Sequence, residues 1–596
     1  MRIERERMWG FFEWLFQQGG LLSGVLLVVL LSALAFTVCY LVAMARYGPG
    51  EGFYVVTRVI YELFARDLPN TSCKRIFAFA KLAFQEAIRR KVLAVMAVFI
   101  VALLFAGWFL DPNADYPAKL YISFVLTGTN YMVLLLGLFL SCFSLPADIK
   151  NKTVQTIVTK PVRSTEIVLG RVLGFTFVGT VLLVLMGLLS YVFVDRGLRH
   201  THEAEEIAAD GMSGTTSFDS HHAHTFNVNP NAVKEAATDE KKGHRHFVEI
   251  TEVNGQRVYS IGPAEGMLEA KIPVFGSLKF TDREGKEADG LNVGYESNYQ
   301  KYIEGGTLCS AIWSFNGITE SLGDELPIEL TLKAFRTYKG DIVTGVQGTI
   351  ILRSSNGRVE SERIPFVIKE FAVDERRVNR KLKGTVDQVP KELDLYKDIA
   401  PDGKMEVIVR CSDKGQYFGM SQADLFLRAG QNSFAWNMFK GYLGIWLQML
   451  IIICFGVMFS TFLSGPVAMI ATMTCLAIGF FGGIAEEVAR GTTPGGGPVE
   501  SMIRMANQAG AMVDLDLGND VLEKSIQGVD TGIMGALYLL TMGLPSFNDL
   551  NTSEFVAYGV NIFEGLVARH MTMALGYFVL TAIVGYFFLK TREMAA

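Results

Sequence analysis

The topology of the chain depends on residues 144–174, SLPADIKNKTVQTIVTKPVRSTEIVLGRVLG, which lie between two long apolar runs at 120–143 and 169–194. Basic side chains outnumber acidic ones in this segment. The bases are Lys150, Lys152, Lys160, Arg163 and Arg171, and the acids are Asp148 and Glu166. Short loops rich in Lys and Arg stay on the cytoplasmic side of a membrane. The segment therefore predicts a cytoplasmic loop between two membrane spans.

Two prolines divide this loop. Pro146 permits a helix start, and the polar residues that follow, 147–159, carry an apolar side. Pro161 ends that helix because a proline disfavours helical geometry in the residue before it. Ser164 is suited to cap the next helix, and Glu166 in the first turn favours the positive end of the helix dipole. We expect a short cytoplasmic helix that could transmit a force from a partner protein to the neighbouring membrane spans.

Composition places the chain among membrane proteins with a water-exposed domain. Its 596 residues are 50% hydrophobic and 19% charged, too apolar for an ordinary soluble enzyme and too charged for a chain that lies wholly in a membrane. No segment resembles a basic face for nucleic acid. We therefore expect an α-helical polytopic membrane protein with an inserted extracytoplasmic β-rich, sandwich-like domain.

Apolar runs long enough to cross a bilayer predict about seven spans. They lie at 21–44, 92–110, 120–143, 169–194, 441–463, 467–485 and 571–589. The basic segment 45–91 is expected in the cytoplasm, which places the N-terminus outside. The acidic loop 486–569 is expected outside, and within it 531–543 is too short to cross and predicts a re-entrant or interfacial piece.

The segment 74–91, KRIFAFAKLAFQEAIRRK, has the pattern of an amphipathic helix. Phe, Ala, Leu and Ile residues form one face, and polar residues recur at helical spacing on the other. This pattern predicts a helix in the cytoplasmic interface of the membrane. Its polar face carries Lys81, Gln85, Glu86, Arg89 and Arg90.

Residues 195–439 are polar and are expected outside, since the preceding span ends there. The part up to 246 is rich in Gly, Ser and His and predicts a solvated linker. Short alternating runs over 247–428 predict an antiparallel β-sandwich. Two cysteines, Cys309 and Cys411, lie in this region. Either a disulfide between them or two unpaired buried thiols is compatible with the pattern.

Seven of the eight histidines lie between 200 and 246. Neutral imidazole binds transition metals, but no carboxylate or cysteine spacing defines a closed site, so the default expectation is a polar linker without metal. The metal candidates, should one bind, are His221, His222 and His224.

The chain lacks two features that would supply energy for transport. It has no G-x-x-x-x-G-K-[ST] phosphate loop, so it cannot bind nucleotide in the Walker manner. Its spans contain almost no ionisable residues, which argues against a proton relay or an ion-coupling carboxylate. Any transport would therefore be driven by another chain.

Three parts of the sequence resemble the ABC-2 type exporter permeases. Residues 148–153 and 160–171 resemble the family's cytoplasmic coupling segment, with Lys152 in place of its usual glycine. Residues 74–91 resemble its connecting helix, and the Leu-Pro-x-Phe element at 544–547 with the basic tail at 590–592 resembles its C-terminal end. The similarity covers 74–194 and 440–594, so the chain would hold the family's six-helix core and one extra span.

This resemblance implies the permease subunit of an ATP-driven ABC exporter in the cytoplasmic (inner) membrane. The implied partners are a separate ATPase, which holds ATP and Mg, and a second permease copy or homologue; no cofactor is expected in this chain. The residues implied in coupling to the ATPase are Asp148, Ile149, Thr153, Gln155, Lys160, Pro161, Arg163 and Glu166. The alternative is a non-transporting scaffold or signalling protein whose outer domain binds a ligand or partner.

The expected organisation has four parts. Residues 1–73 hold the tail, the extra span and a cytoplasmic linker, and 74–194 hold the interfacial helix, three core spans and the coupling segment 144–168. Residues 195–439 form the extracytoplasmic domain, with the linker at 195–246 and the β-rich part at 247–428. Residues 440–596 hold the last three core spans and the loop 486–569.

Overall fold

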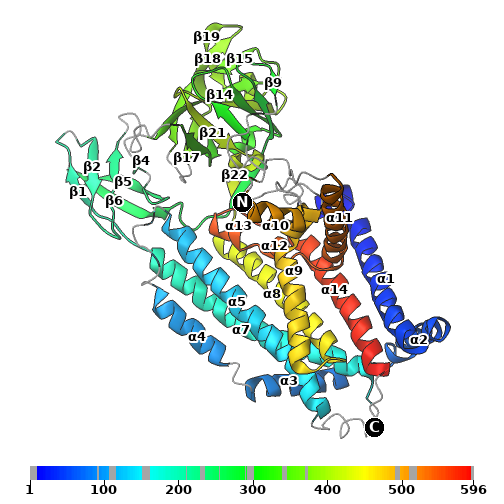
Figure 1. Ribbon diagram of the computed structural model, residues 1–596. Helices are drawn as coiled ribbons and strands as arrows, with labels where there is room; N and C mark the ends of the chain where they lie inside the picture. Colours follow the sequence, from blue (N-terminus) through cyan, green and yellow to red (C-terminus); the bar gives the residue numbers. More distant parts are fainter. Residues whose placement is uncertain are drawn as a thin grey trace.

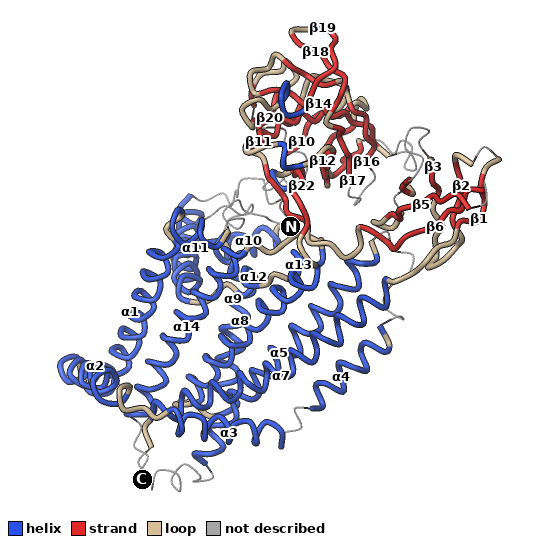
Figure 2. Tube along the Cα trace, turned by 180° about the vertical axis from the view of Figure 1, so that it is seen from behind, coloured by secondary structure: helices blue, strands red, loops and turns tan. Residues whose placement is uncertain are grey.

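The structure is a computed structural model. It describes residues 10–89, 93–106, 110, 114, 116–150, 162–209, 211–228, 235–239, 241–253, 256–288, 290, 301–337, 345–368, 374–489, 497–508, 510 and 520–591. The helices form one region, and the strands form two separate units at one end of it (Figures 1 and 2). This arrangement confirms the predicted combination of apolar helices and an inserted β-rich part.

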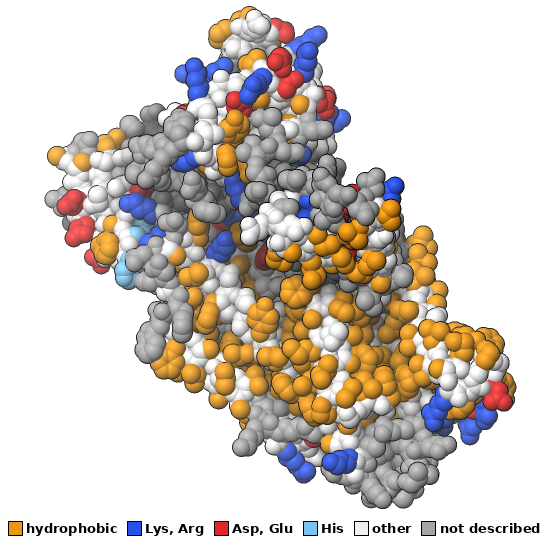
Figure 3. Space-filling view, viewed as in Figure 1, with side chains coloured by type: hydrophobic (Ala, Val, Ile, Leu, Met, Phe, Trp, Pro, Cys, Tyr) orange, Lys and Arg blue, Asp and Glu red, His pale blue; other side chains and the backbone are white. Residues whose placement is uncertain are grey.

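Among the described residues, five helices are long and apolar enough to cross a bilayer. They are α1 (Gly20–Tyr47), α5 (Pro117–Lys150), α7 (Ser164–Leu198), α8 (Phe434–Ser460) and α14 (Glu564–Thr591). Two further helices, α4 (Leu93–Leu104) and α9 (Gly465–Ala489), overlap the other predicted spans, and the apolar part of α9 covers Gly465–Phe481. Figure 3 shows hydrophobic side chains over this region, with charged side chains on the β units and at the opposite end. The chain is a multi-pass membrane protein.

Small residues bring the helices together. The central helix α8 packs against α5, α7, α9 and α14. At Gly456 of α8, an added Cβ would collide with the side chain of Ser141 in α5. At Gly174 of α7, it would lie 2.6 Å from the Cβ of Ala83 in α3 (Cys73–Arg89). Glycine is therefore required where these helices cross, as is common between helices in membranes.

The predicted helix start at Pro146 is wrong, because α5 continues through this proline to Lys150. The helix ahead of Pro146 therefore extends beyond the apolar run, and its last residues reach the loop described above. The next helix, α7, begins at Ser164, but its N-cap is Arg163 rather than Ser164. The Glu166 carboxylate accepts a hydrogen bond from the Arg163 backbone N–H at 3.2 Å, so the acidic first turn acts as expected.

Three short helices and one long one cover the end of the helical region that faces the β units. These are α10 (Pro498–Ala506), α11 (Asp520–Gly543), α12 (Phe547–Leu550) and α13 (Ser553–Ala557). Helix α11 is longer than the predicted 531–543, and its last residue, Gly543, lies near Leu34 in the middle of α1. The chain then returns outward through α12 and α13, and both pack against α8.

The predicted linker at 195–246 is wrong, because the structure has two three-stranded sheets there. One sheet has the order β1-β2-β3 and the other β4-β5-β6. Their bounds are β1 (Ala204–Ile207), β2 (Ser213–Thr216), β3 (Thr225–Asn227), β4 (Glu235–Ala237), β5 (Arg245–Val253) and β6 (Gln256–Glu265). We call residues 200–266 the small β unit. Its apolar core consists of Phe226, Val228, Ala236, Val248 and Ile250.

The larger β domain begins at β7 (Lys271–Phe275), so the predicted boundary at 247 is also displaced. Three antiparallel sheets share one core. Their strand orders are β19-β18-β15-β14-β20-β11-β8-β9, in which β16 also pairs with β14, then β17-β12-β22-β7 and β10-β21-β13. The bounds of their other strands are β8 (Ser277–Thr281), β9 (Glu287–Ala288), β10 (Lys301–Glu304), β11 (Ser310–Asn316), β12 (Glu325–Leu330), β13 (Lys333–Arg336), β14 (Val346–Ser354), β15 (Val359–Ser361), β16 (Ile364–Ile368), β17 (Asp374–Asn379), β18 (Lys381–Val386), β19 (Val389–Asp394), β20 (Lys404–Cys411), β21 (Gln416–Met420) and β22 (Leu425–Gln431).

Main-chain hydrogen bonds join the larger β domain to the helical region. The Lys271 N–H donates to the carbonyl of Gly559 at 2.7 Å, and the Asn561 N–H donates to the carbonyl of Lys271 at 2.8 Å. The first strand of the domain is therefore anchored to the segment between α13 and α14.

The predicted disulfide is not confirmed, because Cys309 and Cys411 are both free, buried thiols. Strands β11 and β20 pair with Ala311 opposite Val409, so the register carries Cys309 toward Cys411 just beyond the ladder. Both thiols nevertheless belong to the apolar core of the domain. The alternative of two unpaired buried thiols matches the structure.

Cys73 gives a direct test of the predicted orientation. It is exposed, and it begins α3 at the end of the helical region opposite the β units. In intact cells an impermeant maleimide should leave Cys73 unmodified and should label a cysteine placed at the exposed Glu392 of β19. Permeabilised cells serve as the control, in which both positions react. Labelling of Cys73 in intact cells would reverse the orientation.

Candidate functional site

Ion pairs in which one partner is buried connect helix ends on the side opposite the β units. Glu166, in the first turn of α7, is fully buried. It accepts hydrogen bonds from Arg75 Nε at 2.8 Å and from the Ser72 backbone N–H at 2.9 Å. Because Ser72 and Arg75 lie at the start of α3, Glu166 fixes the beginning of the amphipathic helix to the beginning of a span.

A second carboxylate joins three further elements. Asp67 ends a π-helical turn, η3 (Leu63–Asp67), after α2 (Pro49–Glu62), and it accepts hydrogen bonds from Tyr586 at 2.7 Å and Lys590 at 3.1 Å. The Arg163 guanidinium donates to the Asp67 carbonyl at 3.1 Å. Burial raises the pKa of Asp67, but the hydrogen bonds from Tyr586 and Lys590 outweigh it and hold the pKa below its ordinary value. The carboxylate is therefore ionised at neutral pH.

Arg171 forms the third connection and joins α3, α5 and α7. Its side chain is 3% exposed. One terminal nitrogen lies 2.5 Å from Glu86 Oε2 and 2.5 Å from Ser144 Oγ, and the other forms an ion pair with Asp148. A guanidinium can bind several acceptors at once because its donors form a rigid planar fork. We call Glu166, Asp67 and Arg171, together with the partners just described, the helix-end network. Those partners are Ser72, Arg75, Arg163, Tyr586, Lys590, Glu86, Ser144 and Asp148.

The predicted coupling and interfacial residues divide into three sets. Asp148, Arg163, Glu166 and Glu86 belong to the helix-end network. Lys81, Gln85 and Arg89 are exposed on α3, which buries Phe79, Ala83 and Ala87 against α7. Ile149 lies in the last turn of α5. Arg90, Thr153, Gln155, Lys160 and Pro161 lie outside the described residues.

Sequence reasoning missed several members of this network. Asp67, Arg75, Tyr586 and Lys590 come from segments far apart along the chain, and no local pattern links them. Arg171 had a local signal, since it lies at the start of the apolar run 169–194, where an arginine requires a partner. Asp148 was predicted as a residue that couples to the ATPase, whereas in the structure it pairs with the buried Arg171.

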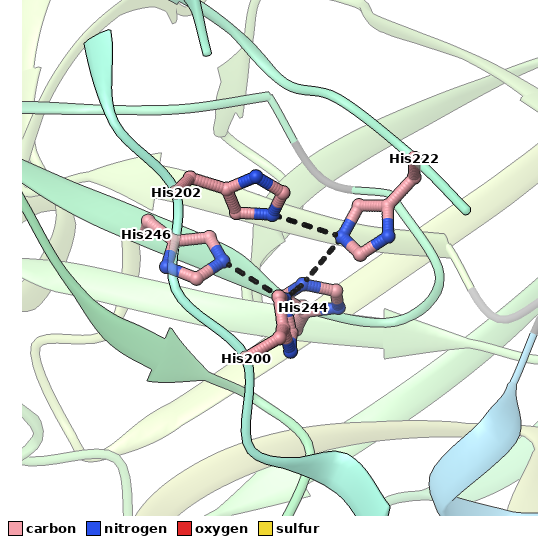
Figure 4. A group of neighbouring side chains, drawn as sticks. All are labelled: His200, His202, His222, His244 and His246. Carbon is pink, nitrogen blue, oxygen red and sulfur yellow. Dashed lines mark hydrogen bonds between the residues drawn. The ribbon is translucent and has the colours of Figure 1, made fainter. Parts of the chain in front are cut away.

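A second candidate site lies in the small β unit, where six histidines converge. Figure 4 draws His200, His202, His222, His244 and His246. Two of the predicted candidates, His222 and His224, belong to it. The third, His221, is exposed, with a positive φ of 64°. The members not named as candidates are His200, His202, His244 and His246. The sequence feature that could have identified these residues is a repeat. Three H-x-H motifs begin at 200, 222 and 244, at a constant spacing of 22 residues.

The fold and these two sites define a multi-pass membrane protein that carries two β units on one side and a network of buried charges on the other. A comparison with known protein families finds no family model that matches the chain, and a comparison with curated proteins finds no match either.

Proposed function

We propose that the chain is the permease subunit of an ATP-driven ABC exporter and that a separate ATPase drives it from the cytoplasmic side. One observation carries this proposal. The segment 151–161 contains four of the eight predicted coupling residues, and described residues close to either end of it belong to the helix-end network. Asp148 precedes it and pairs with Arg171, and Arg163 follows it and binds the backbone of η3. A force applied to the segment would therefore reach α3, α5, α7 and η3 together.

The distribution of charge in the spans supports an external energy source. Within α1, α5, α7, α8 and α14, the Asp, Glu, Lys and Arg residues all lie within about two turns of a helix end. A transporter driven by an ion gradient needs an ionisable side chain inside the membrane to bind the coupling ion. Transport that is driven by ATP hydrolysis in a partner chain requires no such side chain inside the membrane.

Mutation of the coupling motif tests this proposal. We expect the chain, purified from its native membrane, to retain an ATPase with a Walker A motif. Thr153→Ala combined with Gln155→Ala should lower the associated ATP hydrolysis by about tenfold, equivalent to about 1.4 kcal/mol of lost docking energy. Asp148 is unsuitable for this test, because its pairing with Arg171 makes it part of the helical packing.

Glu205→Ala on the exposed face of β1 is the control and should leave hydrolysis unchanged. Normal expression of the Thr153/Gln155 variant with unchanged hydrolysis would contradict the coupling role. Absence of any ATPase from the purified complex would favour the scaffold alternative.

A further inference from the structure

The six histidines of the small β unit are arranged with approximate three-fold repetition. Each of the three H-x-H motifs stands at the beginning of a strand: β1, β3 or β5. Equivalent hydrogen bonds recur between successive repeats. The His224 N–H donates to the Thr216 hydroxyl at 2.8 Å, and the His246 N–H donates to the Thr238 hydroxyl at 2.9 Å. Thr216 and Thr238 are themselves 22 residues apart, so the repeat extends through the hairpins that follow the histidines.

Backbone carbonyls orient five of the six imidazoles. In each of these five, Nδ1 lies 2.7–3.0 Å from a carbonyl oxygen, which can only accept a hydrogen bond. The carbonyls belong to Leu198, Ser217, Ser220, Asp239 and Gly262. Each neutral ring therefore carries its proton on Nδ1 and leaves the lone pair of Nε2 free. Metal-binding histidines are oriented in this way in proteins.

The free nitrogens face one another at short range. His244 Nε2 lies 2.9 Å from His200 Nε2, 3.0 Å from that of His222 and 3.3 Å from that of His224. The Nε2 atoms of His202 and His222 are 3.4 Å apart, and those of His246 and His200 are 3.3 Å apart. A proton on His244 Nε2 could satisfy one of these contacts. The others bring two acceptors together, which is unfavourable unless a cation lies between them.

The six rings occupy the corners of an octahedron. Each ring lies next to all the others except one, with centroids 4.7–5.3 Å apart. Among these six described residues, the pairs without such a contact are His200 with His224, His202 with His244, and His222 with His246. Each opposite pair joins two different motifs, as three-fold symmetry requires.

The separation of the nitrogens matches metal coordination. With metal–nitrogen bonds of about 2.0–2.1 Å, adjacent corners of an octahedron are about 2.9 Å apart and opposite corners about 4.2 Å. The adjacent Nε2 pairs above span 2.9–3.4 Å. A single ion at the centre would therefore meet all six nitrogens with little movement of the rings. Five of the ligand nitrogens, from His200, His202, His222, His244 and His246, all lie within 4.8 Å of one another.

We infer that these six histidines bind one divalent first-row transition-metal ion in an octahedral, all-imidazole site. Imidazole suits Fe, Ni, Cu and Zn, but Cu²⁺ favours tetragonal geometry and protein-bound Zn²⁺ is usually tetrahedral. Six equivalent imidazoles favour Ni²⁺, Co²⁺ or Fe²⁺. The protein fills every coordination position, which is typical of a structural site rather than a catalytic one.

The burial of the ligands and their access to solvent agree with this assignment. Four of the six side chains are 4% exposed or less, and His222 is 6% exposed. His200 is half-buried and lines a cavity of about 940 Å³ at the outer end of α7, which gives an ion a route to the cluster.

The position of the cluster indicates what the ion holds together. His200 follows the last residue of α7, Leu198, by two residues, and Gly243, next to His244, lies against Tyr116 at the start of α5. The ion would join the three hairpins of the small β unit to one another and to the outer end of a membrane span. This inference does not depend on whether the chain transports a substrate.

Metal titration of the full-length chain tests the inference. The protein should be purified in detergent through a tag that contains no histidine, stripped with a chelator and titrated with Ni²⁺. We expect one equivalent to bind, and the Co²⁺-loaded protein to show the weak visible absorption of six-coordinate cobalt. His222→Gln combined with His244→Gln should weaken binding by about 100-fold or more.

His221→Gln is the matched control and should bind like the original protein, since this neighbouring imidazole lies outside the cluster. If the unmodified chain binds Ni²⁺ no more tightly than the His222/His244 variant does, the inference is overturned. Strong four-coordinate cobalt absorption would overturn the octahedral assignment. The cobalt spectrum of the unmodified chain decides the question even if the double variant fails to fold.

Discussion

Arg171→Leu is expected to lower the free energy of unfolding of the helical region by about 3–5 kcal/mol, the range found when one partner of a buried ion pair is removed. The arginine is 3% exposed, and its partners Glu86 and Asp148 have side chains that are 20% and 18% exposed. Without the guanidinium, both carboxylates would remain largely buried beside α7 and would have to protonate or move. Thermal unfolding in detergent, followed by intrinsic fluorescence, would measure the loss.

The matched control is Lys81→Leu, which removes an exposed cation from the same helical layer and should change stability by less than about 0.5 kcal/mol. Adding Glu86→Gln and Asp148→Asn to Arg171→Leu should restore part of the stability, because the uncompensated charges are then absent. If Arg171→Leu and Lys81→Leu lower the free energy of unfolding equally, the ion pairs of Arg171 do not contribute to stability.

Removal of the metal should unfold the small β unit while the larger β domain stays folded. Among the described residues, five form the buried apolar core of the small unit, whereas the larger domain buries a core that includes Trp313, Phe366 and Phe418. A structural metal contributes about 10–16 kcal/mol in small domains that fold around it. Treatment with a chelator should therefore allow trypsin to cut rapidly after Arg257 in β6, and mass spectrometry would identify the cut.

Arg353 in β14 of the larger domain provides the internal control and should remain protected with and without the chelator. Addition of Ni²⁺ should restore protection at Arg257. The same rate of cleavage in the presence and absence of metal would mean that the small apolar core is sufficient for folding.

Local sequence patterns predicted the membrane helices and the strands of the larger domain. Long apolar runs require burial in lipid, and alternating runs such as 326–332 require one buried face. Both requirements can be read from neighbouring residues. Boundaries were less predictable. Pro146 was expected to start a helix, but α5 passes through it, because packing and the ion pair at Asp148 extend the helix beyond the lipid.

The histidine segment shows where a local interpretation failed. Its composition is that of a linker, and an H-x-H pair alone does not make a metal site. The 22-residue spacing was visible in the sequence, but its meaning depended on three hairpins that place the pairs around one point. Backbone carbonyls as remote as Gly262 then orient the rings, and no local rule specifies these partners.

The sequence by itself determined that this chain spans a membrane, which of its loops are basic and that a polar β-rich part is inserted, because hydrophobicity, charge and alternation are properties of consecutive residues. Only the tertiary structure decided that Arg171 joins three helices, that Asp67 binds the end of α14 and that six histidines form one cluster. Those arrangements depend on contacts between segments separated by tens to hundreds of residues, where burial removes water and each polar group must find its partner within the fold.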